Sequence, residues 1–271
     1  MLKIKTILIE VFSYLPFAWA YARSSKKVIY REHRFGMVWE YLNPLIQMAI
    51  WGLVFGLLRS RSGVVVGGNH VPFIPWMLLG MTTWGFMNGA IARAGGSVRK
   101  KKHLFSKLKF PLSVFPAISI ANRLSSYFVL LTISIVVILL SGIFPNVHWL
   151  AFFYYLIAML LFVYFFALFN SNIILRFPDY QNILKPIMRL FFFFSGPVWR
   201  IDNMQEIPNW FVRLMDLTPF SYIITGLRHT FFANSVFREN WLITTIAFWI
   251  VTLILAIIGT HYHFKLRSEI E

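Results

Sequence analysis

Apolar runs of about 20 residues or more recur along this sequence and contain almost no charge. Residues 115–140, 149–175 and 241–262 are three of them. Roughly 20 predominantly apolar residues in a helix cross the hydrocarbon core of a bilayer, which is about 30 Å thick. Of the 271 residues, 58% are hydrophobic and only 13% are charged, whereas soluble domains carry about 25% charged residues. The chain is therefore predicted to be an all-α integral membrane protein.

Six segments are predicted to cross the membrane. They cover residues 37–58, 72–92, 115–140, 149–175, 183–199 and 241–262. A further apolar segment, 209–232, is interrupted by Asp216, Pro219 and Gly226. It is too broken to span the bilayer, so it is interpreted as a re-entrant or interfacial helix pair.

The distribution of Lys and Arg orients the predicted crossings. With both termini in the cytoplasm, 20 of the 26 Lys and Arg residues lie on the cytoplasmic side and 6 lie outside. Such an excess in cytoplasmic connections is the positive-inside pattern. It also explains the net charge of +16, since no basic-aromatic module for nucleic acid is present. We therefore expect a multi-pass protein of a bacterial plasma membrane, with both termini cytoplasmic and no nucleic-acid partner.

Residues 1–36 form an N-terminal amphipathic interface region ahead of a six-helix transmembrane domain that covers residues 37–271. On a helical wheel, cations share one face and less polar residues share the opposite face. The cations are Arg23, Lys26, Lys27, Arg31 and Arg34, and the other face carries Ala18, Tyr21, Ala22, Val28 and Ile29. A helix of this kind lies in the membrane interface. It is either a topological anchor or a gate that attracts the diphosphate of a lipid-linked substrate.

The gate interpretation has a defined set of candidate residues near the entrance of the first crossing. They are Arg23, Lys27, Arg31, Arg34, Gly36, Trp39 and Glu40. Glu40 is the exceptional carboxylate that lies beside a predicted span. Its simplest role is an ion pair with a neighbouring Arg, and the alternative is a direct role in the mechanism.

The connection between the second and third crossings, RAGGSVRKKKHLFSKLKFP, is long, basic and opens with two glycines. Its KKHLFSKLKF part alternates cations with Leu104, Phe105, Leu108 and Phe110, which suits a short helix docked on a partner. The other interpretation is a solvated loop whose charge only orients the protein. A shorter cytoplasmic turn, RFPDYQNILKP, joins the fourth and fifth crossings.

The sequence lacks the motifs of nucleotide-binding and hydrolytic sites. It contains no GxxxxGK[ST] phosphate loop, no GxSxG elbow, no HExxH zinc helix and no cysteine. His261 and His263 form an HxH pair without a third ligand nearby. We therefore predict no catalytic residue, no metal site and no cofactor in this chain. The scarcity of ionisable residues inside the spans argues against a proton-coupled carrier and for an external energy source.

Aromatic residues make up 18% of the chain, and 29 of them are Phe. Aromatic rings stack on the apolar faces of sugars, so one interpretation is a conduit for a sugar polymer. The candidate conduit residues are Tyr155, Phe162, Phe166, Phe169, Phe191 and Phe194. The alternative is that these rings pack between helices or face lipid.

A series of stretches along the chain resembles a known family. RFGMVWEYLNPLIQMAIWGLVFG is followed by VPFIPWMLLGMTTWGFM, KLKFPLSVFPAISIANRL, RFPDYQNILKPIMRLFFFFSGPVW and LTPFSYIITGLRHTFF. The series resembles the type-2 ABC exporter permeases that move lipid-linked glycopolymers. Within them it looks most like the membrane subunit of wall teichoic acid exporters, above all in WEYLNPLIQ and FPLSVFP.

The resemblance implies a half-transporter. Two copies of the chain would form the path, with the first and fifth crossings at the dimer interface. Two separate ABC ATPase subunits would bind ATP and Mg²⁺ and hydrolyse the ATP, so this chain would not itself be an enzyme. The substrate would be undecaprenyl-diphosphate-linked wall teichoic acid, exported across the plasma membrane of a Gram-positive bacterium.

The resemblance also implies roles for particular segments. Residues 13–34 would be the interface helix, with the diphosphate headgroup entering near Arg31 and Arg34, and residues 209–232 would be an extracellular re-entrant pair. Two cytoplasmic coupling helices, the main one at residues 99–107, would contact the ATPase. The residues of this coupling would be Arg99, Lys100, Lys101, Lys102, His103, Leu104, Phe105, Asp179 and Tyr180.

Three other interpretations remain. An exporter of O-antigen or capsular polysaccharide would share the architecture and differ in substrate. A membrane glycosyltransferase or phosphotransferase acting on the same lipid carriers would need an acidic metal-binding motif or a catalytic carboxylate, and neither is found. A structural scaffold for envelope synthesis would not depend on an ATPase partner, whereas an ABC permease would.

Overall fold

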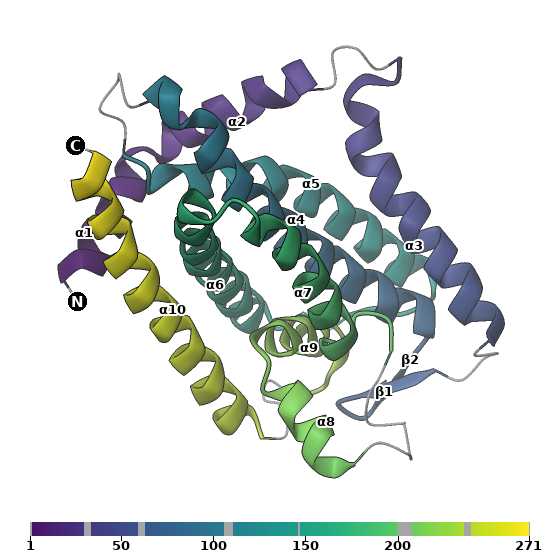
Figure 1. Cartoon of the computed structure of the whole chain (residues 1–271). Coiled ribbons are helices and arrows are strands. Elements are labelled where there is room, and N and C mark those ends of the chain that lie inside the picture. The colour runs from purple at the N-terminus through teal and green to yellow at the C-terminus, as the bar shows by residue number, and fades with distance from the viewer. Residues whose placement is uncertain are drawn as a thin grey trace.

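The computed structural model describes residues 2–29, 34–58, 63–105, 111–145, 147–199, 208–235 and 240–270. Most of this part of the chain is helical (Figure 1). Three of the described helices are long and apolar enough to cross a membrane, namely α5 (Val114–Leu140), α6 (Trp149–Arg176) and α10 (Trp241–Ile270). They correspond to the third, fourth and sixth predicted crossings. The structure therefore agrees with an integral membrane protein.

Helices also occupy the other three predicted crossings. They are α3 (Trp39–Leu58), which follows the short 3₁₀ helix η1 (Gly36–Val38), α4 (Phe73–Phe105) and α7 (Tyr180–Phe194). Helix α7 has 15 residues, which gives a length of about 22 Å, less than the hydrocarbon thickness. It ends at Phe194, whereas the predicted fifth crossing continued to residue 199. The six-crossing topology and its orientation stay predictions.

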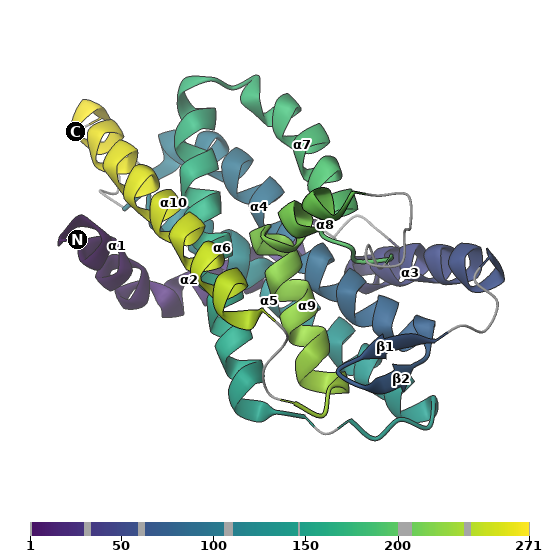
Figure 2. The same ribbon diagram turned by 90° about the horizontal axis from the view of Figure 1, so that it is seen from below.

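The centre of the fold is the packing of α4 on α5 and α6, with α10 on the other side of α6 (Figures 1 and 2). Polar side chains add links inside this core. The Thr82 and Ser134 hydroxyls of α4 and α5 lie 3.1 Å apart, and the Asn172 amide of α6 donates to the Gly259 carbonyl of α10 over 2.7 Å. Hydrogen bonds of this kind supplement van der Waals packing between helices in a bilayer.

The N-terminal region contains two helices, α1 (Leu2–Ser13) and α2 (Leu15–Ile29), instead of one interface helix over residues 13–34. The apolar face predicted for the membrane packs against protein, because Ala18 and Ala22 are buried and Ala18 joins a cluster with Val114 and Phe115 of α5. Large apolar side chains that α1 and α2 leave exposed include Phe12, Phe17 and Trp19. The helical wheel identified the amphipathic pattern but not the surface that covers its apolar face.

Helix α4 continues through Gly95 and Gly96, where the sequence predicted the start of a loop. Each glycine costs about 1 kcal/mol relative to alanine in a helix, and the Arg and Lys residues that follow are good helix formers. The first part of the basic connection is therefore the end of a 33-residue helix and not a separate short one. Residues 106–110, with Leu108 and Phe110, lie outside the described part of the chain.

The broken segment 209–232 forms two helices, α8 (Asn209–Asp216) and α9 (Pro219–Phe232). The Thr218 side chain caps α9 by accepting a hydrogen bond from the Ser221 backbone N–H (3.3 Å), and Pro219 occupies the first turn. Both are favoured features of a helix start. The helix pair is confirmed, while its re-entrant, extracellular position remains a prediction.

Sequence analysis missed a β-hairpin between α3 and α4. Strands β1 (Val64–Val66) and β2 (Asn69–Val71) pair antiparallel around Gly67 and Gly68, both with positive φ (53° and 89°). Two such residues are typical of tight hairpin turns, so the Gly-Gly pair beside three valines was a readable signal. The Asn69 side chain donates to the Phe232 carbonyl over 2.8 Å and thereby holds the hairpin at the end of α9 (Figure 2).

The side chain of Arg228 joins α9 to two other parts of the fold. Its guanidinium donates to the Trp76 carbonyl of α4 (3.0 Å) and to the carbonyls of Gly196 (2.8 Å) and Pro197 (2.6 Å), just after α7. It also lies 3.4 Å from the centre of the Trp76 ring. The residue is 3% exposed. Arg228 thus fixes the chain beyond α7 to α4 and α9.

Candidate functional site

A cavity of about 560 Å³ lies between α3, α4, α5 and α7. It is of the size that small-molecule sites and substrate paths have. Helices α3 and α7 begin near the same end of the cavity. Helix α4 runs antiparallel to them along its wall. The two ends of the cavity therefore differ in chemistry, because each helix contributes polar residues near one end and aromatic residues near the other.

The polar end carries three cations. Arg123 comes from α5, and Lys185 and Arg189 come from consecutive turns of α7. Asn88 of α4 and Gln181 of α7 add neutral hydrogen-bonding groups. These side chains lie on the side predicted to be cytoplasmic. Such a group can bind an anion, since Arg offers paired N–H donors and Lys a compact charge.

The guanidinium of Arg123 lies directly against α4. A Cβ atom at Gly89 would be 2.9 Å from both Cζ and Nε of Arg123. That contact is too close, so the missing side chain of Gly89 makes the space that the guanidinium occupies. The position of Arg123 is thus determined by two helices, which is typical of a preorganised site.

Glu40 lies in the same cavity and is only 4% exposed. Its carboxylate accepts a hydrogen bond from the hydroxyl of Ser126 on α5. Ser126 follows Arg123 by three residues, so both project from one face of α5. Glu40 was predicted to pair with a neighbouring Arg. The structure adds a serine partner and shows that the carboxylate links α3 to α5.

The opposite end of the cavity is aromatic. Trp51 of α3 and Trp84 of α4 both contact Phe192 of α7, with ring centroids 5.9 and 5.6 Å apart. Phe193 also lines the cavity, and Trp199 stacks on it at 5.0 Å. Trp199 donates its indole N–H to the Phe193 carbonyl over 3.0 Å. Trp51, Trp84, Phe192 and Phe193 thus give this end of the cavity an apolar, aromatic lining.

The six predicted conduit aromatics are not among the residues that line this cavity. Phe162, Phe166 and Phe191 pack around Phe220 of α9 with centroids 5.1, 6.0 and 5.0 Å from its ring. Phe169 has its backbone against Gly259. In the same core, Tyr155 contacts Tyr222 at 5.3 Å, and Phe194 contacts Phe211 at 5.7 Å. Their conduit role stays a prediction, and in this structure they pack between helices.

The predicted gate residues are spread over several elements. Glu40 lines the cavity, Trp39 begins α3, and Gly36 lies in η1 with a φ of 50°. Arg23 and Arg34 are exposed. Lys27 belongs to α2, but its side chain is outside the described part of the structure, and Arg31 lies outside the described residues altogether.

Sequence reasoning missed Arg123, Lys185 and Arg189 as site residues because it used them only to orient the helices. A readable signal was present in α5, where Arg123 is the only charged residue of the helix and Ser126 and Tyr127 lie on the same face. Ionisable residues inside a predicted span are candidates for function by default.

The predicted coupling residues gather at one end of the fold. Arg99, Lys100, Lys101, Lys102, His103, Leu104 and Phe105 form the last turns of α4, and only their backbone is described. Asp179 is exposed in the turn before α7, and the Tyr180 hydroxyl donates to Asn170 over 2.7 Å. The Gln181 amide nitrogen lies 3.0 Å from where a Cβ of Gly96 would be, so this turn adjoins α4. The start of α7 therefore adjoins α4 at Gly96, three residues before Arg99, so the two predicted contacts lie near one another.

In the described part of the chain, no three His, Asp or Glu side chains are grouped as a metal site would need. The groups that the cavity presents are cations, amides, aromatic rings and the Glu40 carboxylate.

Comparison with known proteins gives consistent findings. Residues 17–232 match the family described as ABC-2 type transporter. The chain is similar to the O-antigen export system permease protein RfbA of Myxococcus xanthus, with 22% identity over 198 residues that cover 73% of each chain. It is also similar to the O-antigen export system permease protein RfbA of Klebsiella pneumoniae, with 22% identity over 242 residues that cover 89% of this chain and 88% of the relative.

Proposed function

The chain belongs to the ABC-2 type transporter family, and from this premise we propose that it is the permease subunit of an ATP-driven exporter of a lipid-linked glycopolymer. The observation that carries the proposal is the cavity between α3, α4, α5 and α7. One end holds three cations and the other holds aromatic rings, which matches a ligand with a charged phosphate part and a long sugar part.

In this proposal the diphosphate headgroup binds at the polar end. Arg123, Lys185 and Arg189 supply charge-assisted hydrogen bonds to phosphate oxygens. Glu40 holds α3 and α5 together through Ser126. The polymer passes along Trp51, Trp84 and the α7 aromatics. Sugar rings stack on these surfaces without directional contacts that would have to break at each step.

The partners follow from the family. Two ABC ATPase subunits would bind and hydrolyse ATP with Mg²⁺, and two copies of this chain would form the path, as a homodimer. The basic end of α4 and the turn at Asp179 and Tyr180 are the proposed ATPase contacts, since they lie together. The chain itself would have no enzymatic activity.

We propose wall teichoic acid on undecaprenyl diphosphate as the substrate, in the plasma membrane of a Gram-positive bacterium. The alternative substrate is O-antigen or capsular polysaccharide, and the names of the two relatives favour it. Both polymers present a lipid-linked diphosphate to the polar end of the cavity, so that end is compatible with either substrate.

The test is depletion of this protein in its own cell. Phosphate covalently bound to the wall and lipid-linked polymer retained inside are then measured together. Loss of wall phosphate with internal accumulation supports teichoic acid export. Unchanged wall phosphate with loss of a neutral surface polysaccharide would show that the substrate is O-antigen or capsular polysaccharide instead. Unchanged surface polymers of both kinds would refute export of a glycopolymer.

A further inference from the structure

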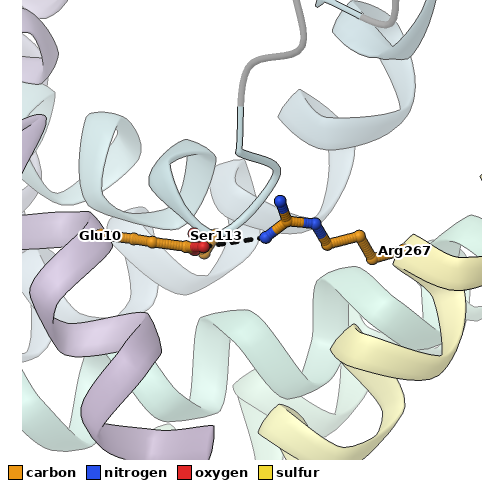
Figure 3. Close-up of polar contacts among 3 residues, drawn as sticks. All are labelled: Glu10, Ser113 and Arg267. Atoms are coloured by element: carbon orange, nitrogen blue, oxygen red, sulfur yellow. Dashed lines mark hydrogen bonds and ion pairs between the residues drawn. The ribbon is translucent and has the colours of Figure 1, made fainter. Parts of the chain in front are cut away.

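One carboxylate near the N-terminus joins three helices that are far apart in the sequence. The Glu10 Oε1 atom of α1 accepts a hydrogen bond from Arg267 Nη1 of α10 over 2.8 Å, across 257 positions of the chain. Its Oε2 atom accepts from the hydroxyl of Ser113, immediately before α5, over 2.7 Å. Figure 3 shows the carboxylate between the two donors. We refer to Glu10, Ser113 and Arg267 as the clasp.

The clasp is better shielded than an ordinary surface ion pair. The Glu10 side chain is 19% exposed, the Arg267 side chain is 37% exposed, and Ser113 is fully buried. The Tyr164 hydroxyl of α6 donates to the Ser113 carbonyl over 3.1 Å, which fixes the serine from another side. Exposed ion pairs contribute little because water screens them and their side chains are mobile. Here a second hydrogen bond to a fixed group restrains the carboxylate.

Ser113 occupies the N-cap position of α5 but makes no capping hydrogen bond with its side chain. Its hydroxyl donates to Glu10 instead, so a carboxylate lies beside the N-terminus of α5. Negative charge is favourable there because the helix dipole is positive at that end. Glu10 therefore holds the start of α5 by a hydrogen bond and a dipolar interaction, and its ion pair with Arg267 joins that point to α10.

The position of the clasp gives it a functional meaning. Residues 93–111 form the basic connection that leads into α5, and α5 carries Arg123 and Ser126 into the cavity. A displacement of this connection can tilt α5, and so move Arg123 and Ser126, only if the start of α5 is held as a pivot. The clasp attaches that start to α1 and α10.

From this geometry we infer that Glu10 is a positioning residue for energy coupling. It holds the start of α5 so that movement imposed on the basic connection is passed to the polar end of the cavity. This inference rests on the proposed function as an ATP-driven exporter. It adds a residue from α1, which sequence analysis did not connect with coupling.

The test uses the complete complex of the permease with its ATPase in lipid vesicles, and it measures polymer exported per ATP hydrolysed. Glu10→Gln keeps the size of the side chain and removes its charge. Lys265→Gln is the matched control because it removes an exposed charge from the same end of α10. The double variant E10R/R267E exchanges the charges and restores an ion pair.

Coupling between sites in proteins typically changes an affinity or a ratio by about 5- to 150-fold. We expect Glu10→Gln to lower the export-to-hydrolysis ratio at least about fivefold while ATP hydrolysis per assembled complex is retained. Lys265→Gln should stay within about twofold of the unmodified complex. The double variant restores only the ion pair between α1 and α10 and loses the contact with Ser113, so it should recover only part of the ratio. A ratio for Glu10→Gln within twofold of the unmodified complex would overturn the inference.

A second readout separates positioning from folding. The chain has no cysteine, so nitroxide labels can be placed on K5C and S268C without background. Glu10→Gln should broaden the distance distribution between the labels and leave the yield of complex unchanged. If export and hydrolysis instead fall together with the yield, Glu10 is only structural and the inference fails. If the unmodified complex shows no ATP-dependent export, the proposed function fails, and the inference with it.

Discussion

Two regions of this molecule hold an arginine away from bulk water, and they do so in opposite ways. Arg228 is surrounded by partners, with three backbone carbonyls and the Trp76 ring against its guanidinium. Arg123 lies beside Gly89 and faces a cavity of about 560 Å³ together with two more cations. The first arrangement leaves no room for a ligand. The second places three cations and the Glu40 carboxylate around open space, as the proposed binding of a phosphate requires.

The largest expected effect is the loss of stability when Arg228 is replaced. Arg228→Ala would leave three buried carbonyls without their donor, and each unsatisfied group costs about 1–3 kcal/mol. We expect a loss of about 3–5 kcal/mol of stability, in the range for breaking a buried charged contact. Thermal unfolding in detergent would measure it. Arg213→Ala on the exposed surface of α8 is the control, and equal Tm values for the two variants would contradict the assignment.

The next prediction concerns the cavity. Arg123→Gln should reduce polymer export by about tenfold or more, because hydrogen bonds to charged groups contribute about 1.5–3 kcal/mol. Its Tm should fall less than that of Arg228→Ala, since Arg123 lines a cavity whereas Arg228 is surrounded by partners. Arg93→Gln removes an exposed cation from α4 outside the cavity and serves as the matched control. Surface polymer per molecule of permease is the measurement. If Arg123→Gln unfolds the protein and Arg228→Ala does not, the assignment of Arg228 to structure and of Arg123 to binding is wrong.

The smallest effect sharpens the comparison within the cavity. Ser126→Ala removes the hydroxyl that donates to Glu40, and a typical hydrogen bond contributes about 1 kcal/mol. We expect a Tm loss well below that of Arg228→Ala and a modest reduction of export. Ser126→Thr keeps the hydroxyl and should recover both values. Failure of the threonine variant to recover either would mean that shape, and not the hydrogen bond, matters at this position.

Much of the architecture could be read from the sequence. Long apolar runs located the starts of the helices α3 to α7 and α10 within a few residues, and Asp216 with Pro219 located the break between α8 and α9. These are local signals, because apolar length and helix-breaking residues act where they stand. The Gly67–Gly68 turn was equally local and was overlooked.

The candidate site was less predictable because it depends on which helices meet. Nothing near Arg123 in the sequence indicates that Gly89 lies across from it. The helical wheel of residues 18–29 could not show that α5 covers its apolar face. The predicted aromatic conduit relied on ring density alone, whereas the rings that line the cavity were selected by packing, with Trp51 and Trp84 among them.

The continuity of α4 has a mechanical consequence. At about 1.5 Å per residue, its 33 residues extend for about 50 Å, well beyond the thickness of a hydrocarbon core. Near one end, the Trp76 carbonyl accepts a hydrogen bond from Arg228. The other end is the basic stretch at residues 99–105. A displacement of the basic end of α4 would therefore tilt the whole helix and reach the opposite end at Trp76. Gly95 and Gly96 are the positions where α4 would bend first, because glycine lowers the stability of a helix.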